Sequence, residues 1–236
     1  MSDSMKDIDK LINISKKNKK NIFIAYCFRF EKGIQLIKKY IDEEKIGKIY
    51  SARAEFGQYL PDWRPWQDYR KSYTSNKNLG GGIILDGSHE IDYMRWFFGD
   101  VQEVFCYSNK ISNLEVNTED VAEIFFKFKN EIICNIHLDF IRPGYHRFCE
   151  IIGEKGMLEW NFSENNVKYY NLKDKSWKIH KLKTNVNDMY VSEIKHFIKS
   201  IDKQEKSLID GEDGKKSLQL ALAAKKSSIL KKVVKI

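Results

Sequence analysis

The stretch VAEIFFKFKNEIICNIHLDF, Val121 to Phe140, decides the fold class of this 236-residue chain. In its second half apolar residues alternate with polar ones, which is the period of a half-buried β-strand. The apolar set is Ile132, Cys134, Ile136, Leu138 and Phe140. The first half is a second strand pattern that precedes the other across a tight turn. The two halves are therefore predicted to form an antiparallel hairpin.

Strand patterns continue on both sides of this hairpin. One lies before it, over residues 48–57, and a meander over 148–182 follows, with turns at 153–156 and 174–176. Helical spacing of apolar residues predicts helices over 31–47, 88–98, 188–202 and 213–230. The order predicts an α+β domain: an open, mostly antiparallel sheet with helices on one face.

Residues 1–47 follow a different pattern. A short helix comes first, and the apolar run NIFIAYCF, residues 21–28, is then predicted to be a buried strand. A second helix ends near Gly47, before the strand at 48–57. The alternation of helix and strand is typical of the end of a doubly wound α/β sheet. We therefore expect a remnant of such a domain over 1–47 and the sheet domain over 48–236.

The charge and the cysteines restrict the function class. Lys and Arg number 41 against 33 Asp and Glu, a net charge of +8, but the lysines are spread along the chain. This distribution indicates a solvated surface, so no nucleic-acid partner is predicted. The four cysteines have neither metal-ligand nor disulfide-scaffold spacing, which favours a reducing compartment. With no apolar run of about 18 residues and no signal-peptide pattern, we expect a cytoplasmic protein without a membrane partner.

The segment LGGGIILDGSHEIDYMRWFFGD, residues 79–100, contains the clearest candidates for chemistry. Adjacent glycines allow positive φ or close approach, although such a run can also be a simple turn into a buried strand. Asp86 and His89 stand three residues apart, so both can lie on one side of a first helical turn. A carboxylate can fix the tautomer of a histidine and stabilise its charged form. A helix N-cap by Asp86 or Ser88 explains the spacing equally well.

Residues 58–78 are predicted to be irregular and are rich in aromatic rings and arginines. Aromatic rings stack on the C–H face of sugars, and guanidinium groups pair with carboxylate or phosphate, so this segment suits a sugar with an anionic group. A loop held in place by its tryptophans is nearly as good an explanation. The five histidines fall on separate predicted elements, so no metal site is predicted.

Taken together, these segments resemble the C-terminal part of the glucose–fructose oxidoreductase/inositol dehydrogenase (Gfo/Idh/MocA) family. The resemblance covers nearly the whole chain, and the ordered set is more specific than any one member. The segments that carry it are AYCFRF (25–30), EEKIGKIYSARAEFG (43–57), GGGIILDGSHEIDYMRWFFGD (80–100), EIIGEKGMLEW (150–160) and GEDGKKSLQLALAAKKSS (211–228).

The resemblance implies an oxidoreductase that uses NAD or NADP and acts on a small-molecule sugar or nucleotide-sugar. In such proteins an N-terminal Rossmann domain holds the dinucleotide, and the open sheet holds the substrate and mediates homo-oligomers. Residues 1–47 would then be the C-terminal remnant of the Rossmann domain. Residues 48–236 would be the substrate and oligomerisation domain.

The resemblance also implies roles for single residues. Asp86 and His89 correspond to the catalytic pair, with His89 exchanging the proton of the reacting hydroxyl. Many members place these two residues one position further apart, so the shorter spacing indicates a subgroup with the pattern HExDY. The cleft residues implied are Trp63, Arg70 and Tyr73 on the substrate side, and Arg29 and Arg64 on the cofactor side.

Two family motifs are missing from the 236 residues. No G-x-G-x-x-G pattern is present to receive a pyrophosphate, and no Glu-Lys-Pro motif precedes the first helix. We therefore expect a family protein without most of its Rossmann half, inactive alone, with a separate N-terminal half as a possible partner. Apolar faces of residues 21–28 would then be exposed. The alternative is a non-catalytic sugar-binding or oligomerisation module.

Overall fold

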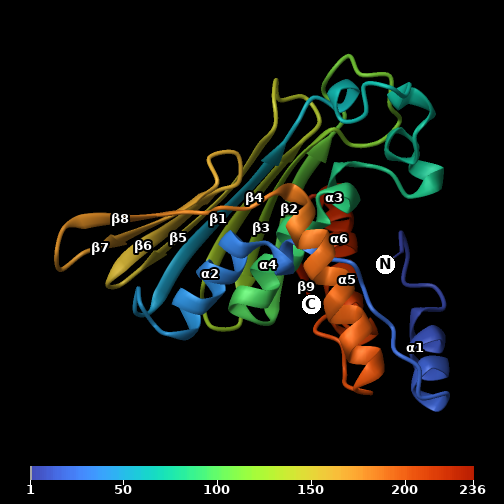
Figure 1. Ribbon diagram of the computed structural model, residues 1–236. Coiled ribbons are helices and arrows are strands. Elements are labelled where there is room, and N and C mark those ends of the chain that lie inside the picture. The colour runs from blue at the N-terminus through green and yellow to red at the C-terminus, as the bar shows by residue number, and fades with distance from the viewer. Residues whose placement is uncertain (1) are drawn as a thin grey trace.

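An open β-sheet organises the computed structural model, which describes residues 2–236 (Figure 1). The strand order within these residues is β8-β7-β6-β5-β1-β4-β3-β2-β9. β1 and β4 run parallel and every other neighbouring pair runs antiparallel, so the predicted mostly antiparallel sheet is confirmed. The strands are β1 Ile49–Gly57, β2 Val101–Asn109, β3 Val121–Phe128, β4 Ile133–Asp139, β5 His146–Gly153, β6 Gly156–Asn161, β7 Asn166–Asn171, β8 Ser176–Lys181 and β9 Val234–Lys235.

Helices pack on one face of this sheet, as predicted (Figure 1). Alternate residues of β4, such as Cys134 and Ile136, are fully buried beneath them, while Ile133 on the opposite face is exposed. Within residues 2–236 no helix is both long enough and apolar enough to cross a bilayer. The helices are α1 Ile8–Lys17, α2 Lys32–Asp42, α3 Ile83–Asp86, α4 Ser88–Phe98, α5 Val186–Asp202 and α6 Gly211–Leu230.

The strand predicted over residues 21–28 is wrong. Residues 20–26 are irregular, and Cys27–Phe30 form a 3₁₀ helix. A strand needs a neighbour along its edge, whereas this segment passes between helices, and the N–H of Ile24 donates to the carbonyl of Ile209 at 3.0 Å. Tyr26, Cys27 and Phe28 are buried in the core of the sheet domain. The exposed apolar face expected from the sequence is therefore not found at these three residues.

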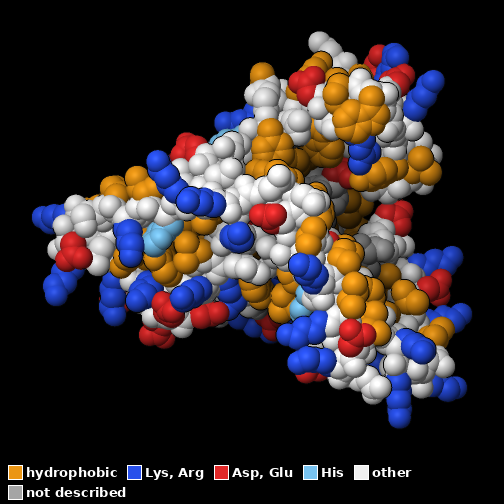
Figure 2. All heavy atoms as spheres, viewed as in Figure 1, with side chains coloured by type: hydrophobic (Ala, Val, Ile, Leu, Met, Phe, Trp, Pro, Cys, Tyr) orange, Lys and Arg blue, Asp and Glu red, His pale blue; other side chains and the backbone are white. Residues whose placement is uncertain are grey.

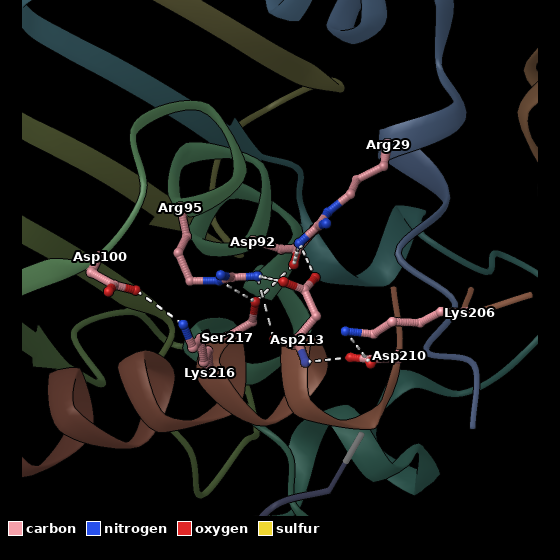
Figure 3. Close-up of polar contacts among 9 residues, drawn as sticks. All are labelled: Arg29, Asp92, Arg95, Asp100, Lys206, Asp210, Asp213, Lys216 and Ser217. Atoms are coloured by element: carbon pink, nitrogen blue, oxygen red, sulfur yellow. Dashed lines mark hydrogen bonds and ion pairs between the residues drawn. The ribbon is translucent and has the colours of Figure 1, made fainter. Parts of the chain in front are cut away.

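A buried ionic network fastens this segment to the helices (Figure 3). Arg29 donates from Nε and from its terminal nitrogen to the two carboxylate oxygens of Asp92 on α4, both at 2.7 Å. The guanidinium also lies 2.6 Å from the carboxylate of Asp213 on α6, which in turn pairs with Arg95. Ser217 donates to Asp92 at 2.7 Å. The network thus joins three segments that are far apart in sequence.

The opposite face of the sheet is polar around His137 on β4. Its Nδ1 lies 2.6 Å from Glu123 Oε1 on β3, and its Nε2 lies 3.1 Å from Asp139 Oδ2. The hydrogen bond with Asp139, helped by that with Glu123, raises the pKa of His137 to about 9. Protonated His137 therefore links two neighbouring strands at ordinary pH.

Replacing Arg29 by alanine is expected to lower the free energy of unfolding by about 3–5 kcal/mol, because the charge of buried Asp92 would lose its main partner. Arg70→Ala is the matched control. Its guanidinium pairs with carboxylates at the surface, where such a pair contributes about 0–1 kcal/mol. Urea unfolding measures both losses. A loss for Arg29→Ala no larger than for the control would contradict the structural role of the network.

The stabilising effect of His137 is expected to decline in alkaline solution. Its folded pKa of about 9 lies above the ordinary value near 6.5, so protonation favours the folded state. The contribution is complete below about pH 6.5 and is lost as pH rises through about 9. Urea unfolding of the wild type and His137→Gln at about pH 6, 8 and 10 should show a shrinking difference in stability. A difference that stays constant across this range would count against the two ion pairs.

Candidate active site

The three glycines allow the chain to pack closely against its own loop. A Cβ on Gly81 would lie 2.2 Å from the carbonyl oxygen of Tyr73, and Gly82 has a φ of 114°, which favours glycine. The N–H of Gly82 donates to the carbonyl of Thr74 at 3.0 Å. The glycines lead into helix α3 and not into a strand, and they hold the loop that carries Tyr73 beside that helix.

Asp86, the last residue of α3, is paired with Tyr73. The Tyr73 hydroxyl donates to Asp86 Oδ1 at 2.8 Å, while Asp86 Oδ2 is enclosed and has no hydrogen-bond partner among the described residues. Burial raises the pKa of Asp86 to about 6, although the Tyr73 hydrogen bond and the nearby charge of Arg64 oppose the rise. This carboxylate is therefore mostly ionised at neutral pH and has one oxygen unused.

His89 lies in the first turn of α4 and is held by aromatic rings. It packs edge-on against Tyr26 and Phe28, with ring centroids 5.5 and 5.2 Å away. Its Nδ1 is enclosed without a hydrogen-bond partner within residues 2–236. Burial, and then the charge of Arg147, lowers the pKa of His89 to about 3. The imidazole is therefore neutral and has a ring nitrogen to offer.

The expected contact between Asp86 and His89 is not found among the described residues, and the charged form of His89 is disfavoured. The reason is a break in the helix: α3 ends at Asp86, and α4 begins at Ser88 after Gly87. The two side chains therefore do not share a helical turn. The N-cap alternative is also wrong, because Gly87 occupies that position and no side chain caps α4.

Two cavities adjoin these residues. One, of about 300 Å³, is lined by Asp86, Tyr73 and Tyr26, and we refer to it as the Asp86 cavity. The other, of about 470 Å³, is lined by Trp63 and Phe28 among others, and is the Trp63 cavity. The two rings that hold His89 thus line different cavities, while His89 itself is not among the described lining residues of either. Figure 2 shows a notch between the lobe of the aromatic loops and the lobe that carries α5.

Trp63 and Arg64 both line the Trp63 cavity, in keeping with a role in the cleft. The indole N–H of Trp63 donates to the carbonyl of Gln58 at 3.0 Å, which fixes the ring. The charge of Arg64 partly offsets the rise that burial causes in the pKa of Asp86 and of Tyr73. Tyr73 lines the Asp86 cavity, where its hydroxyl donates to Asp86.

Arg29 and Arg70 are not brought to either cavity. The Arg29 side chain is only 2% exposed and is paired with two aspartates, so its guanidinium serves the packing of the chain in this structure, and the cofactor role stays a prediction. Arg70 is half exposed and pairs with Asp68 and Glu115 at the surface. Both arginines satisfy carboxylates of the chain itself, which the sequence motifs did not reveal.

The sequence analysis missed the buried pair of Arg147 and Glu90. The Arg147 guanidinium lies 4.0 Å from the ring centroids of both Phe28 and Phe56, and its Nε is 2.7 Å from Glu90 Oε1. The sequence pattern indicates this burial, because Arg147 lies two residues before buried Cys149 and so points to the same inner face of β5. An arginine on the buried face of a strand requires a carboxylate partner.

The described residues do not fit a dinucleotide pyrophosphate. Such a group needs a glycine turn between a strand and a helix N-terminus, free of negative charge. Gly82, directly before α3, faces the carboxylate of Glu119, because a Cβ on it would lie 2.4 Å from Glu119 Oε1. No cluster of His, Cys, Asp and Glu within residues 2–236 has the arrangement of a metal site.

A family model describing the GFO/IDH/MocA C-terminal domain matches residues 34–159. The myo-inositol 2-dehydrogenase of Thermotoga maritima is 29% identical over 247 residues, a match that covers 100% of this chain and 70% of that protein. The inositol 2-dehydrogenase of Salmonella paratyphi B is 26% identical over 158 residues, covering 65% of this chain and 43% of that protein. The chain thus spans only part of these relatives.

Among solved structures, levoglucosan dehydrogenase in complex with NADH and L-sorbose superposes with a TM-score of 0.89. The superposition covers 100% of this chain and 71% of that protein, at 18% sequence identity, so this likeness concerns the fold alone. The family model spans more than half of the chain, and the resemblance inferred from the motifs is confirmed. This chain therefore belongs to the Gfo/Idh/MocA family of oxidoreductases.

Proposed function

We propose that this chain is the substrate-binding and proton-transfer half of an NAD(P)-dependent oxidoreductase that acts on a sugar or polyol. One observation carries the proposal: Tyr73 and Asp86 are hydrogen-bonded in the wall of a cavity, and Tyr26, which lines the same cavity, packs against neutral His89. The names of the relatives, dehydrogenases of inositol and levoglucosan, support a polyhydroxylated substrate.

Oxidation of a secondary alcohol removes a proton from the hydroxyl and a hydride from the carbon. We assign the proton to Asp86, whose free Oδ2 and pKa of about 6 suit a base that works near neutral pH. His89, with a pKa of about 3, is a weak base, and its unpaired Nδ1 is assigned to accept a hydrogen bond from the same hydroxyl. Tyr73 keeps the Asp86 carboxylate ionised.

The Trp63 cavity is the proposed place of the substrate ring. Its volume of about 470 Å³ lies within the range of roughly 300–1,000 Å³ that is usual for small-molecule sites. The Trp63 and Tyr145 rings offer apolar faces for the C–H groups of a sugar, and Arg64 offers hydrogen-bond donors. In this proposal the reacting hydroxyl lies on the side of the ring nearest His89, whose flanking rings Phe28 and Tyr26 line the Trp63 cavity and the Asp86 cavity respectively.

The dinucleotide is proposed to be held by a domain outside these 236 residues, because Gly82, at the start of α3, faces the carboxylate of Glu119. In this arrangement residues 1–47 adjoin that domain, as a proposed remnant of it, and residues 48–236 bind the substrate. When bound, the dinucleotide would supply the acceptor of the hydride. The described residues supply the hydroxyl's proton acceptor and the walls of the cavity.

A second candidate function is a non-catalytic binding or assembly module. The sheet face opposite the helices carries large exposed apolar side chains, namely Tyr107, Phe125, Ile133 and Ile152. Such a face is suited to burial against a second copy of the chain. We propose homo-oligomers through this face in either case. The four cysteines are free and buried, which supports a reducing, cytoplasmic location.

Residues 1–236 alone are expected to give no dehydrogenase turnover with NAD or NADP on a panel of sugars and polyols, because they provide no pyrophosphate site. The same chain joined behind the dinucleotide-binding domain of the Thermotoga maritima relative is expected to turn over at least one panel member. Absorbance of the reduced cofactor measures both. Turnover by the chain alone would overturn the assignment of the cofactor site, and a folded but inactive fusion would favour the assembly module.

In that fusion, kcat/KM is expected to rise with pH through an apparent pKa near 6, as Asp86 loses its proton. Asp86→Asn should lower kcat/KM by roughly 10²–10⁴-fold and remove this limb. Tyr73→Phe should move the limb to higher pH, because the hydrogen bond that favours the ionised carboxylate is lost. Asp68→Asn, the same change in the same loop, is the control. If kcat/KM of Tyr73→Phe rises with pH at the same apparent pKa as in the unchanged fusion, the hydrogen bond between Tyr73 and Asp86 does not control this ionisation.

A further inference from the structure

We propose that the substrate extends beyond one ring and that a second site next to the Trp63 cavity binds an uncharged glycosyl group. The inference rests on the proposed function and names its substrate class: a glycoside with at least two rings. The second site is a cavity of about 210 Å³ between the β6–β7 turn, residues 184–185 and the first turns of α5. We refer to it as the Asn165 cavity.

The two cavities adjoin along a common wall. Tyr145, Phe162, Val186 and Met189 line both of them. The Asn165 cavity alone, at about 210 Å³, falls below the range of roughly 300–1,000 Å³ that is usual for an independent ligand site. It is therefore better suited to extend the neighbouring site than to hold a separate ligand.

The shared wall is aromatic and well fixed. Tyr145 and Phe162 have ring centroids 5.6 Å apart, and Phe162 packs edge-on against Phe28 at the same distance. Tyr145 remains 37% exposed, so part of its ring is available to a ligand. An apolar ring surface shared by two neighbouring cavities suits the C–H faces of a carbohydrate that occupies both.

The far wall of the Asn165 cavity offers neutral hydrogen-bonding groups. Thr184 donates from its hydroxyl to Asn165 Oδ1 at 3.1 Å, which orients the amide. Among the described residues no partner is present for the amide nitrogen of Asn165, so that nitrogen is available as a donor. Ser163 and Ser192 add two hydroxyls to the same lining. Amides and hydroxyls of this kind match the hydroxyls of a sugar ring.

The charges around the Asn165 cavity argue against a nucleotide diphosphate. Lys32 is the single cation in the lining formed by the described residues, and two acids, Glu31 and Asp188, lie there with it. Glu31 accepts from the N–H of Ile34 at 2.8 Å. A diphosphate is usually met by several cationic or N–H donors, and a lining of one cation and two acids provides no such field. The structure favours a neutral glycosyl group.

Calorimetric titration of residues 1–236 tests the inference with matched ligands. The pairs are D-glucose with maltose or cellobiose, and myo-inositol with its galactoside. In the wild type, the two-ring member of at least one pair is expected to bind about tenfold tighter than its one-ring partner. Asn165→Ala combined with Thr184→Val should abolish this advantage and leave one-ring binding unchanged. Asn187→Ala, which lies outside the lining, is the control.

The other outcomes separate this inference from the proposed function. One result would support the proposed function and overturn the second site: one-ring ligands bind and lose their binding in Trp63→Ala, but no two-ring ligand binds more tightly than its one-ring partner. A two-ring advantage that survives in the double variant would also overturn it. An advantage for uridine diphosphate glucose that is lost in the double variant would replace the neutral glycosyl group by a nucleotide. No binding of any member would overturn both proposals.

Discussion

The ion pair between Arg29 and Asp92 is the contact on which the candidate active site depends. Arg29 and Phe28 lie in one short 3₁₀ helix, which Tyr26 directly precedes, and Asp92 lies one turn after His89 on α4. Two hydrogen bonds of 2.7 Å fix these segments to each other. The same contact therefore brings the two rings against His89. Arg29 also pairs with Asp213, which fixes the same 3₁₀ segment to α6 (Figure 3). The packing of this segment against α4 and α6 and the placement of His89 therefore have a common cause.

The electrostatics of the site follow from which carboxylates are paired. Glu90 is satisfied by Arg147, and Asp92 by Arg29, so neither is available for chemistry. Asp86 has only the hydroxyl of Tyr73 and keeps one oxygen free. Burial raises its pKa to about 6 and lowers that of His89 to about 3. Of Asp86, Glu90 and Asp92, Asp86 is the carboxylate that has no arginine partner and keeps one oxygen without a hydrogen bond among the described residues.

The sheet has two faces with different tasks. The face beneath the helices is apolar except for paired groups such as Arg147, and the end of this face forms the cavities. The other face mixes the ion pairs of His137 with exposed apolar side chains. Since side chains alternate along each strand, β4 contributes Cys134 to one face and Ile133 to the other. This alternation lets one sheet serve both a proposed ligand site on one face and a proposed contact between copies on the other.

The sequence by itself determined the elements whose cause is local. The hairpin of β3 and β4 and the meander of β5 to β8 follow from alternation and turns, and α4 to α6 follow from helical spacing. The motif at residues 80–100 indicated the family and the residues Asp86 and His89. The partners of these residues were decided only by the tertiary structure. Tyr73 reaches Asp86 because glycines admit its loop, Arg29 is buried because two helices bring aspartates to it, and residues 21–28 are not a strand because helices surround them. Such contacts join distant parts of the chain, and no local period encodes them.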